Sequence, residues 1–214
     1  LMLSRSCSEI IPSISIRIKT ISRLVLFSSR SLSGEIRFGF FKHATIEDKK
    51  RALAVGALGE RDGFVAGLGT DSFVLKRKGE DLFGVGGWGL TLSDEASAAW
   101  LGREVLRRTL RAHDGLVPHT ALTRAILDEF GGAMAIVEFA RDATPREYSK
   151  LACGVIGSAT VGDRGAQVIM QRGGTWIAQA FEQLGIMDTE QRMIFSCGSG
   201  VTACVLALAA ESNL

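Results

Sequence analysis

The chain has 214 residues, of which 46% are hydrophobic and 22% are charged, the ordinary composition of a globular protein with a core. Its net charge of +2 leaves little positive surplus, so nucleic acid is not an expected partner. The sequence contains no run of about 18 apolar residues, so no membrane span is expected.

The four cysteines are scattered along the chain and form no C-x-x-C pair. This spacing argues against a structural zinc site and against a disulfide framework, and it favours a reducing compartment. We therefore expect a cytoplasmic protein without metal-ligating residues of its own.

Residues 1–50 differ in character from the rest of the chain. The first 34 residues are rich in Ser, Ile and Arg, and Glu9 is the single acid among them. Such a composition occurs in organelle transit peptides, and a poorly ordered or foreign leader is the alternative. We favour the leader and expect residues 1–34 to pack poorly.

A β-hairpin is predicted after a first short strand. Residues 63–69 form an apolar run that ends in glycine. Residues 72–76 and 81–85 then flank the polar segment 77–80, which contains Gly79, and two such runs around a glycine turn are typical of a hairpin.

Helices are predicted from residue 93 onward. Ser93 can cap a helix whose first turn holds Asp94 and Glu95, both favourable at the positive end of the helix dipole. A second helix follows Pro118 and stops at Gly131, because glycine favours the left-handed conformation that ends helices.

Two further helices complete the predicted order. Thr144 and Glu147 form a capping box with Pro145 at the first helical position, so a third helix starts there. A last helix contains Trp176 and closes at Gly185. From the apolar periodicity we expect these buried residues on the helices: Leu101, Val105, Leu110, Ile126, Phe130 and Trp176.

Two glycine-containing loops carry polar groups suited to a ligand. The turn Gly67-Leu-Gly-Thr-Asp-Ser72 presents backbone N–H groups and hydroxyls at one point, as loops that hold phosphate do, although a plain hairpin turn explains it equally well. In Gly86-Gly-Trp-Gly89 the glycines allow close approach of backbone to a ligand, and Trp88 offers a flat apolar face. Asp94 can accept hydrogen bonds from hydroxyls, with helix capping as its alternative role.

The order of these motifs resembles one known family. The Gly-Leu-Gly-Thr-x-Ser turn, the hairpin, Gly-Gly-Trp-Gly and Asp-Glu-Ala-Ser-Ala-Ala-Trp-Leu-Gly-Arg resemble the carboxy-terminal half of the N-acetylglucosamine/glucosamine kinase and BadF/BadG ATPase family. The segments 56–63 and 113–115 fit the same group. The resemblance covers residues 51–185.

The resemblance implies a fold, a reaction and site residues. The fold is expected to be α/β, half of an actin-like (ribonuclease-H-like) ATPase domain with several helices and a small sheet. The implied reaction is ATP- and Mg²⁺-dependent phosphorylation of a small amino sugar, N-acetylglucosamine or glucosamine, and a homo-oligomer is left open. By the same resemblance, Gly69, Thr70 and Ser72 contact the cofactor phosphates, and Gly87, Trp88 and Asp94 lie against the sugar.

The sequence departs from the family pattern at several points. Asp71 stands where the family has glycine and puts a carboxylate near the phosphates, and Ser93 stands where glycine is usual. Residues 1–50 contain no counterpart of the family's first phosphate loop or catalytic aspartate. Phosphoryl transfer needs positioning from both sides, so a degenerate or truncated remnant and a non-catalytic fragment are alternatives to an active kinase.

The last residues of the chain resemble a different family. Residues 193–195 are predicted to form a strand, and Cys197 follows it in a glycine-rich turn that leads into an apolar helix, a setting that lowers a thiol pKa. The segment resembles the active loop of rhodanese-type mercaptopyruvate sulfurtransferases, with Cys197 as the sulfur-carrying nucleophile. A scaffold strand beside the kinase ATP site is the alternative. We favour the sulfurtransferase fragment and divide the chain into residues 1–50, 51–185 and 186–214.

Overall fold

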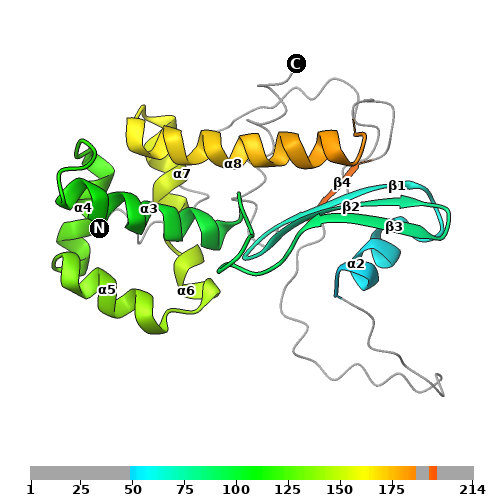
Figure 1. The fold of residues 1–214 in the computed structure, drawn as a ribbon, viewed down its shortest axis with the longest axis horizontal. Coiled ribbons are helices and arrows are strands. Elements are labelled where there is room, and N and C mark those ends of the chain that lie inside the picture. The colour runs from blue at the N-terminus through cyan, green and yellow to red at the C-terminus, as the bar shows by residue number, and fades with distance from the viewer. Residues whose placement is uncertain (1–48, 187–192, 197–214) are drawn as a thin grey trace.

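The computed structural model describes residues 49–186 and 193–196, and side chains are described from residue 54 to residue 186. These residues form a small sheet and a group of helices (Figure 1). The helices are α2 (Lys49–Leu58), α3 (Ala98–His113), α4 (Ala121–Phe130), α5 (Ala133–Asp142), α6 (Pro145–Ser149), α7 (Ala152–Thr160) and α8 (Arg164–Gln183). The strands are β1 (Gly63–Leu68), β2 (Ser72–Lys78), β3 (Asp81–Gly86) and β4 (Met193–Ser196).

The four described strands form one mixed sheet in the order β3-β2-β1-β4. β1 pairs antiparallel with β2, and β2 pairs antiparallel with β3, which confirms the predicted hairpin. Its turn contains Gly79 with φ of 61°. β4 lies parallel to β1, with Phe64 opposite Met193, so the predicted strand near residue 193 is confirmed as a member of this same sheet.

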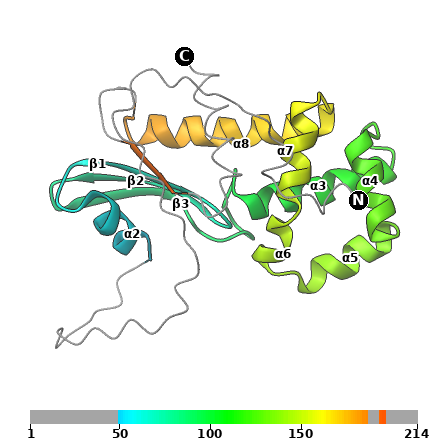
Figure 2. The same ribbon diagram turned by 180° about the vertical axis from the view of Figure 1, so that it is seen from behind.

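Helices cover both faces of the sheet (Figures 1 and 2). On one face Phe64 and Val74 pack against Ala180 and Leu184 at the end of α8. On the other face α2 contributes Ala54, which packs with Phe73 and Leu75. Every residue of β1 is buried, as expected for a central strand covered on both sides.

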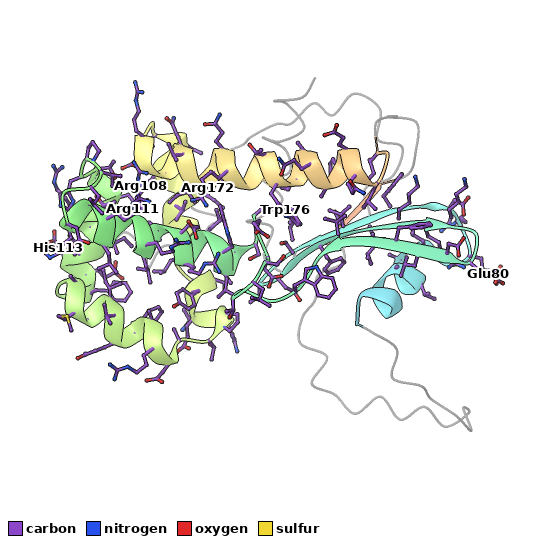
Figure 3. All side chains as sticks on the ribbon, viewed as in Figure 1. Glu80, Arg108, Arg111, His113, Arg172 and Trp176 are labelled. Carbon is purple, nitrogen blue, oxygen red and sulfur yellow. The ribbon has the colours of Figure 1, made fainter. Side chains whose placement is uncertain are left out.

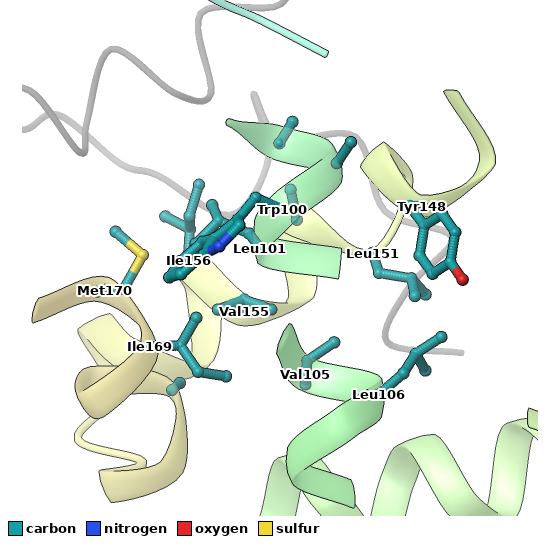
Figure 4. Packing of buried hydrophobic residues seen from close by; sticks show 14 of the residues in the cluster. Trp100, Leu101, Val105, Leu106, Tyr148, Leu151, Val155, Ile156, Ile169 and Met170 are labelled. Atoms are coloured by element: carbon teal, nitrogen blue, oxygen red, sulfur yellow. The ribbon is translucent and has the colours of Figure 1, made fainter. Parts of the chain in front are cut away.

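A second, larger core lies between the helices, and α3 runs through it (Figure 4). Trp100, Leu101 and Val105 of α3 pack there with Val155 of α7 and Ile169 of α8. The beginning of α8 packs in this helical core, and its end packs in the core beside the sheet. The helix α8 therefore connects the helical core to the sheet. None of the described helices is long and apolar enough to cross a lipid bilayer.

The predicted core residues divide into two groups. Leu101, Val105 and Ile126 are fully buried, which confirms the helical periodicity. The three others that we expected to be buried are only partly so, namely Leu110, Phe130 and Trp176. The prediction that residues 1–34 pack poorly lies outside the described residues.

Two predicted helix ends are confirmed in detail. α4 ends at Gly131, which adopts the left-handed conformation with φ of 80°. α6 begins with reciprocal bonds: Glu147 N–H donates to Thr144 Oγ1 at 3.3 Å, and Thr144 N–H donates to Glu147 Oε2 at 2.7 Å. These local signals act within a few residues, so the sequence alone is enough to reveal them.

Other helix boundaries were predicted wrongly. α3 starts at Ala98 with Ser97 as its N-cap, and not at Ser93, because Asp94 and Ala96 adopt positive φ values of 62° and 65° that no helix allows. The helix α5 was not predicted. α8 begins at Arg164, well before Trp176, with Asp163 as its N-cap.

Asp163 caps two helices with one carboxylate. Its Oδ1 accepts the backbone N–H of Ala166 in α8, and its Oδ2 accepts that of Leu122 in α4, each at 3.0 Å. Burial alone would raise the pKa of Asp163, but these N–H donors and the Thr120 hydroxyl hold the pKa below its ordinary value. The ionised side chain therefore fixes the starts of α4 and α8 relative to each other.

Cys153 of α7 is disulfide-bonded, and this single bond does not amount to the disulfide framework that the cysteine spacing argued against. The other three cysteines lie outside the described residues.

Candidate functional site

The two loops singled out in the sequence lie side by side in the structure. The turn loop (residues 69–71) connects β1 to β2, and the glycine loop (residues 86–97) connects β3 to α3. The backbone N–H of Ala98 donates to the carbonyl of Gly69 at 2.8 Å. The Ser72 hydroxyl donates to the carbonyl of Glu95 at 2.6 Å. Predicted cofactor residues and predicted sugar residues are therefore brought together at one place.

Thr70 is the side chain that the turn loop exposes. The Gly69 N–H is already used, because it donates to the carbonyl of Asp71 at 2.9 Å. Ser72 is fully buried, and its hydroxyl is engaged with the glycine loop. Of the three predicted phosphate contacts, Thr70 is thus the one whose side chain faces solvent, next to the half-buried Asp71.

Three residues of the glycine loop adopt left-handed backbone conformations, which glycine adopts more readily than other residues. Gly86, Gly87 and Gly89 have φ values of 83°, 72° and 90°. A Cβ on Gly86 would come within 2.8 Å of the ring of Trp176, which reaches the loop from α8 (labelled in Figure 3). Trp88, between these glycines, is 74% exposed and presents its indole to solvent.

Asp94 belongs to the glycine loop, and its side chain is buried, with only 3% exposed. Its Oδ1 accepts the backbone N–H of Gly89 at 3.3 Å. Burial raises the pKa of Asp94 above its ordinary value, and the negative charge of Asp71 raises it further, while the N–H groups of Gly89 and Ser72 lower it in part. The carboxylate is an internal acceptor of the site and does not face solvent.

An ion network around the buried Glu104 supports the glycine loop from α3. Arg103 donates through Nη1 to the carbonyl of Leu90, and its Nη2 lies 3.5 Å from Glu104 Oε1. Glu104 is 4% exposed and also accepts from Arg107 at 3.0 Å and from Arg172 of α8 at 2.8 Å. Figure 3 shows Arg172 between α8 and α3.

Sequence reasoning missed this network. It considered only the apolar side of this helix, although Glu104 and Arg107 stand three residues apart, a spacing that lets charges pair on a helix. The pairing with Arg172 had no signal in the sequence, because Arg172 lies 68 residues further along the chain.

The charge of Asp71 makes the turn loop more favourable to an anion that carries a cation than to a bare anion. Within the described ranges, no group of three or more His, Cys, Asp or Glu side chains gathers to hold a metal ion. Mg²⁺ prefers hard oxygen donors and commonly arrives on nucleotide phosphates. The Thr70 hydroxyl suits a phosphate oxygen, whereas the Asp71 carboxylate opposes one unless a cation offsets its charge.

The structure also has a pocket away from these loops. It measures about 350 Å³ and lies between α2 and the hairpin, near the exposed Glu80 labelled in Figure 3. Its lining includes Ala54, Arg77 and Leu82 and none of the predicted site residues. It is at the opposite end of β2 from the turn loop, so we do not assign the candidate site to it.

The sulfurtransferase interpretation gains no support. Cys197 and the glycine-rich turn after it lie outside the described residues. The strand before them, β4, pairs with β1 from Phe64 to Gly67 within the sheet that carries the turn loop. This placement is what the scaffold alternative expects, so the preference for a separate rhodanese-like fragment is not upheld by the sheet topology.

Known proteins that resemble the chain are amino-sugar kinases. No family model matches it. It is 31% identical over 125 residues to the glucosamine kinase of Vibrio cholerae, a match that covers 58% of this chain and 42% of that kinase. It is 37% identical over 79 residues to the N-acetyl-D-glucosamine kinase of Dictyostelium discoideum, covering 36% of this chain and 25% of that one. Neither relative is a sulfurtransferase.

Solved structures agree with these sequence matches. A proposed N-acetylglucosamine kinase from Chromobacterium violaceum superimposes with a TM-score of 0.60 at 31% identity, covering 71% of this chain and 52% of that one. A second, from Porphyromonas gingivalis, has a TM-score of 0.58 at 22% identity and covers 75% and 56%, which supports the fold alone.

The predicted resemblance and α/β fold are confirmed by these comparisons. The matches cover at most about half of the relatives' own lengths.

Proposed function

From the relationship of this chain to N-acetylglucosamine and glucosamine kinases, we propose that it carries the nucleotide- and sugar-facing part of an ATP-dependent amino-sugar kinase, or of a degenerate remnant of one. The proposed substrate is a small amino sugar, either N-acetylglucosamine or glucosamine. The disulfide at Cys153 opposes the reducing compartment that the cysteine spacing favoured, so a cytoplasmic location is not part of this proposal. The division at residues 51 and 185 belongs to the same proposal.

One observation carries the proposal: the turn loop and the glycine loop are in contact, joined by Ala98 N–H to Gly69 at 2.8 Å and by Ser72 to Glu95 at 2.6 Å. A kinase must hold its two substrates side by side so that the phosphoryl group can be transferred in line. The contact between two loops of these types, in the order seen in the resembling family, therefore supports the proposal.

The residues have distinct proposed roles. Thr70 contacts a phosphate oxygen through its exposed hydroxyl, and the backbone at Gly69 allows the phosphates to approach closely. Trp88 provides an apolar surface for one face of a sugar ring, and Gly87 leaves room beside it. When bound, magnesium-ATP supplies the phosphoryl group and offsets the negative charge near Asp71.

We predict that Asp71→Asn changes nucleotide affinity in a metal-dependent way. An ionised carboxylate about 4 Å from a phosphate charge costs about 4 kcal/mol at an effective dielectric of 20, and bound Mg²⁺ offsets part of this cost. The unmodified chain should therefore bind magnesium-ADP more tightly than ADP in EDTA. Asp71→Asn should strengthen the binding of ADP in EDTA by about tenfold or more. The affinities for magnesium-ADP and for ADP in EDTA should therefore differ less in this variant than in the unmodified chain.

Isothermal titration calorimetry on the 214-residue chain measures both affinities. Glu80→Gln is the matched control, because it removes one exposed carboxylate at the far end of the hairpin and should leave both affinities unchanged. If neither the unmodified chain nor Asp71→Asn binds ADP at millimolar concentration with or without Mg²⁺, the nucleotide role of the turn loop is wrong, and a non-catalytic fragment becomes the better account.

A further inference from the structure

Both ends of the glycine loop pack against one face of α8. At the first end, a Cβ at Gly86 would lie 2.8 Å from two ring atoms of Trp176. Near the other end, a Cβ at Gly173 of α8 would lie 3.3 Å from the Cα and the Cβ of Ala96. Gly173 and Trp176 are three residues apart, a spacing that places them on the same side of the helix.

These two contacts leave the loop little room to shift. The same Cβ position at Gly86 lies 3.0 Å from the carbonyl oxygen of Ser72, so the Gly86 backbone is enclosed between β2 and the indole of Trp176. Ala96 is fully buried. Trp176 itself packs against both the helical core and the core beside the sheet (Figure 3). A movement of α8 would therefore displace both ends of the glycine loop.

The loop carries the exposed Trp88 between these two ends. Trp88 is 74% exposed, two residues after Gly86, and it stands between Gly87 and Gly89. An indole that lies mostly in solvent takes its position mainly from the backbone that carries it. A binding surface of this kind must be held to within about 0.5 Å of its productive geometry. The position of Trp88 therefore depends on what fixes the ends of the loop.

We infer that Trp176 and Gly173 are positioning residues that fix the two ends of the glycine loop and thereby set the place of Trp88. Neither residue contacts the sugar in this role. That the ligand at Trp88 is an amino sugar rests on the proposed function, whereas the packing of α8 against the loop rests on the distances themselves.

The first test is NMR on the full chain without ligand. Trp176→Leu removes the ring atoms beside Gly86 and keeps an apolar side chain in the core. The amides of Gly89 and Ser93 hydrogen-bond within the loop, at 3.3 Å and 2.8 Å. We expect both amides to exchange about tenfold faster or more as the loop opens locally, and the indole N–H signal of Trp88 to shift.

Gly173→Ala perturbs the other end of the loop without weakening the helix. The added Cβ would lie 3.3 Å from Ala96, below the optimum of about 3.5–4.0 Å between carbon atoms, so Ala96 must move. Alanine is a better helix former than glycine, so a change at the loop would not come from loss of α8. We expect the same amide and indole signals to change as in Trp176→Leu. This variant also serves if Trp176→Leu does not fold.

The matched control is Phe181→Leu, which shortens another partly buried aromatic side chain of α8 that packs against both cores. It should lower Tm and leave the signals of the glycine loop unchanged, because only the packing beside the loop should move Trp88. Amides in the β1–β2 ladder report whether each variant is folded.

Calorimetric titrations then distinguish a positioning role from a purely structural one. Trp176→Leu should weaken the binding of glucosamine or N-acetylglucosamine by about tenfold or more, since small misplacements of binding groups are costly. The affinity for magnesium-ADP should change less than about threefold, because the β1–β2 ladder holds the turn loop in place. Phe181→Leu should leave both affinities unchanged below its Tm.

The outcomes separate the inference from the proposed function. Unchanged exchange at Gly89 and Ser93 and an unchanged Trp88 indole signal, in both Trp176→Leu and Gly173→Ala, would overturn the inference even if ligands bind. Equal losses of sugar and ADP affinity in Trp176→Leu would also overturn it, because the residue would then only stabilise the fold. Changed loop signals in a chain that binds neither ligand would uphold the positioning and reject the kinase assignment.

Discussion

Replacing Gly102 with alanine is expected to destabilise the chain by about 3 kcal/mol, the upper end of the usual cost of overpacking a core. A Cβ at this position would lie 1.9 Å from the carbonyl oxygen and 2.7 Å from the carbonyl carbon of Tyr148. These are backbone atoms, so no side-chain rotation relieves the overlap, and α3 and α6 must move apart. Alanine's higher helix propensity returns only about 1 kcal/mol.

The matched control is Gly56→Ala in α2, another glycine inside a helix. A Cβ at Gly56 meets nothing within 4 Å, so this variant should be neutral or slightly more stable. Thermal unfolding followed by circular dichroism measures both. Gly102→Ala should lower Tm by roughly 6–12 °C, given about 2–4 °C per kcal/mol for a chain of this size. Equal Tm values for Gly102→Ala and the unmodified chain would mean that α3 and α6 do not approach this closely.

Glu104→Gln is expected to lower the free energy of unfolding by about 2 kcal/mol. Glu104 is 4% exposed and holds Arg103, Arg107 and Arg172 within 3.5 Å, so glutamine leaves three cations without their shared anion. Removing one partner from a fully buried pair costs about 3–5 kcal/mol. The cost is smaller here, because the side chains of Arg107 and Arg172 are 64% and 57% exposed and can turn to water.

Glu129→Gln is the control for this variant. Glu129 is exposed on α4, so the same chemical change should alter stability by no more than about 0.5 kcal/mol. Urea unfolding of the three proteins gives the free energies. The account of the network is wrong if Glu104→Gln is as stable as Glu129→Gln, since the carboxylate would then hold α3 and α8 together no better than a neutral amide does.

Features set by neighbouring residues could be predicted from the sequence. The hairpin around Gly79, the end of α4 at Gly131 and the capping box of Thr144 all depend on contacts within a few positions. The ligand roles of Thr70 and Trp88 stay predictions.

Features set by distant contacts could not be predicted. The part of α8 before Trp176 was not predicted, and it contains Gly165 and Gly173, a residue type that usually weakens a helix. A Cβ at Gly165 would lie 2.7 Å from Arg108 Nε, and one at Gly173 would lie 3.3 Å from Ala96, so close packing from other elements explains both glycines. The hydrophobic pattern of the sequence gives no sign that other elements pack against these glycines.

The roles of the polar residues in the site show the same limit. Ser72 and Asp94 were predicted to bind ligands because hydroxyls and carboxylates in glycine-rich loops commonly do so. In the structure both are buried: the Ser72 hydroxyl donates to Glu95 of the other loop, and Asp94 accepts from Gly89 of its own loop. Their contact with a ligand stays a prediction. Whether a polar side chain faces a ligand or another loop depends on burial, which the sequence of a short irregular segment does not determine.

The central claim, that the turn loop binds nucleotide and the glycine loop binds amino sugar, is tested most directly by an NMR titration of the full chain. Magnesium-ADP is added first, and glucosamine or N-acetylglucosamine second, while backbone amide and indole N–H signals are followed. We expect ADP to shift Gly69 and Thr70, and the sugar to shift Gly87 and the exposed indole of Trp88. Saturation without shifts at these residues, or shifts confined to the pocket around Ala54 and Leu82, would contradict the claim.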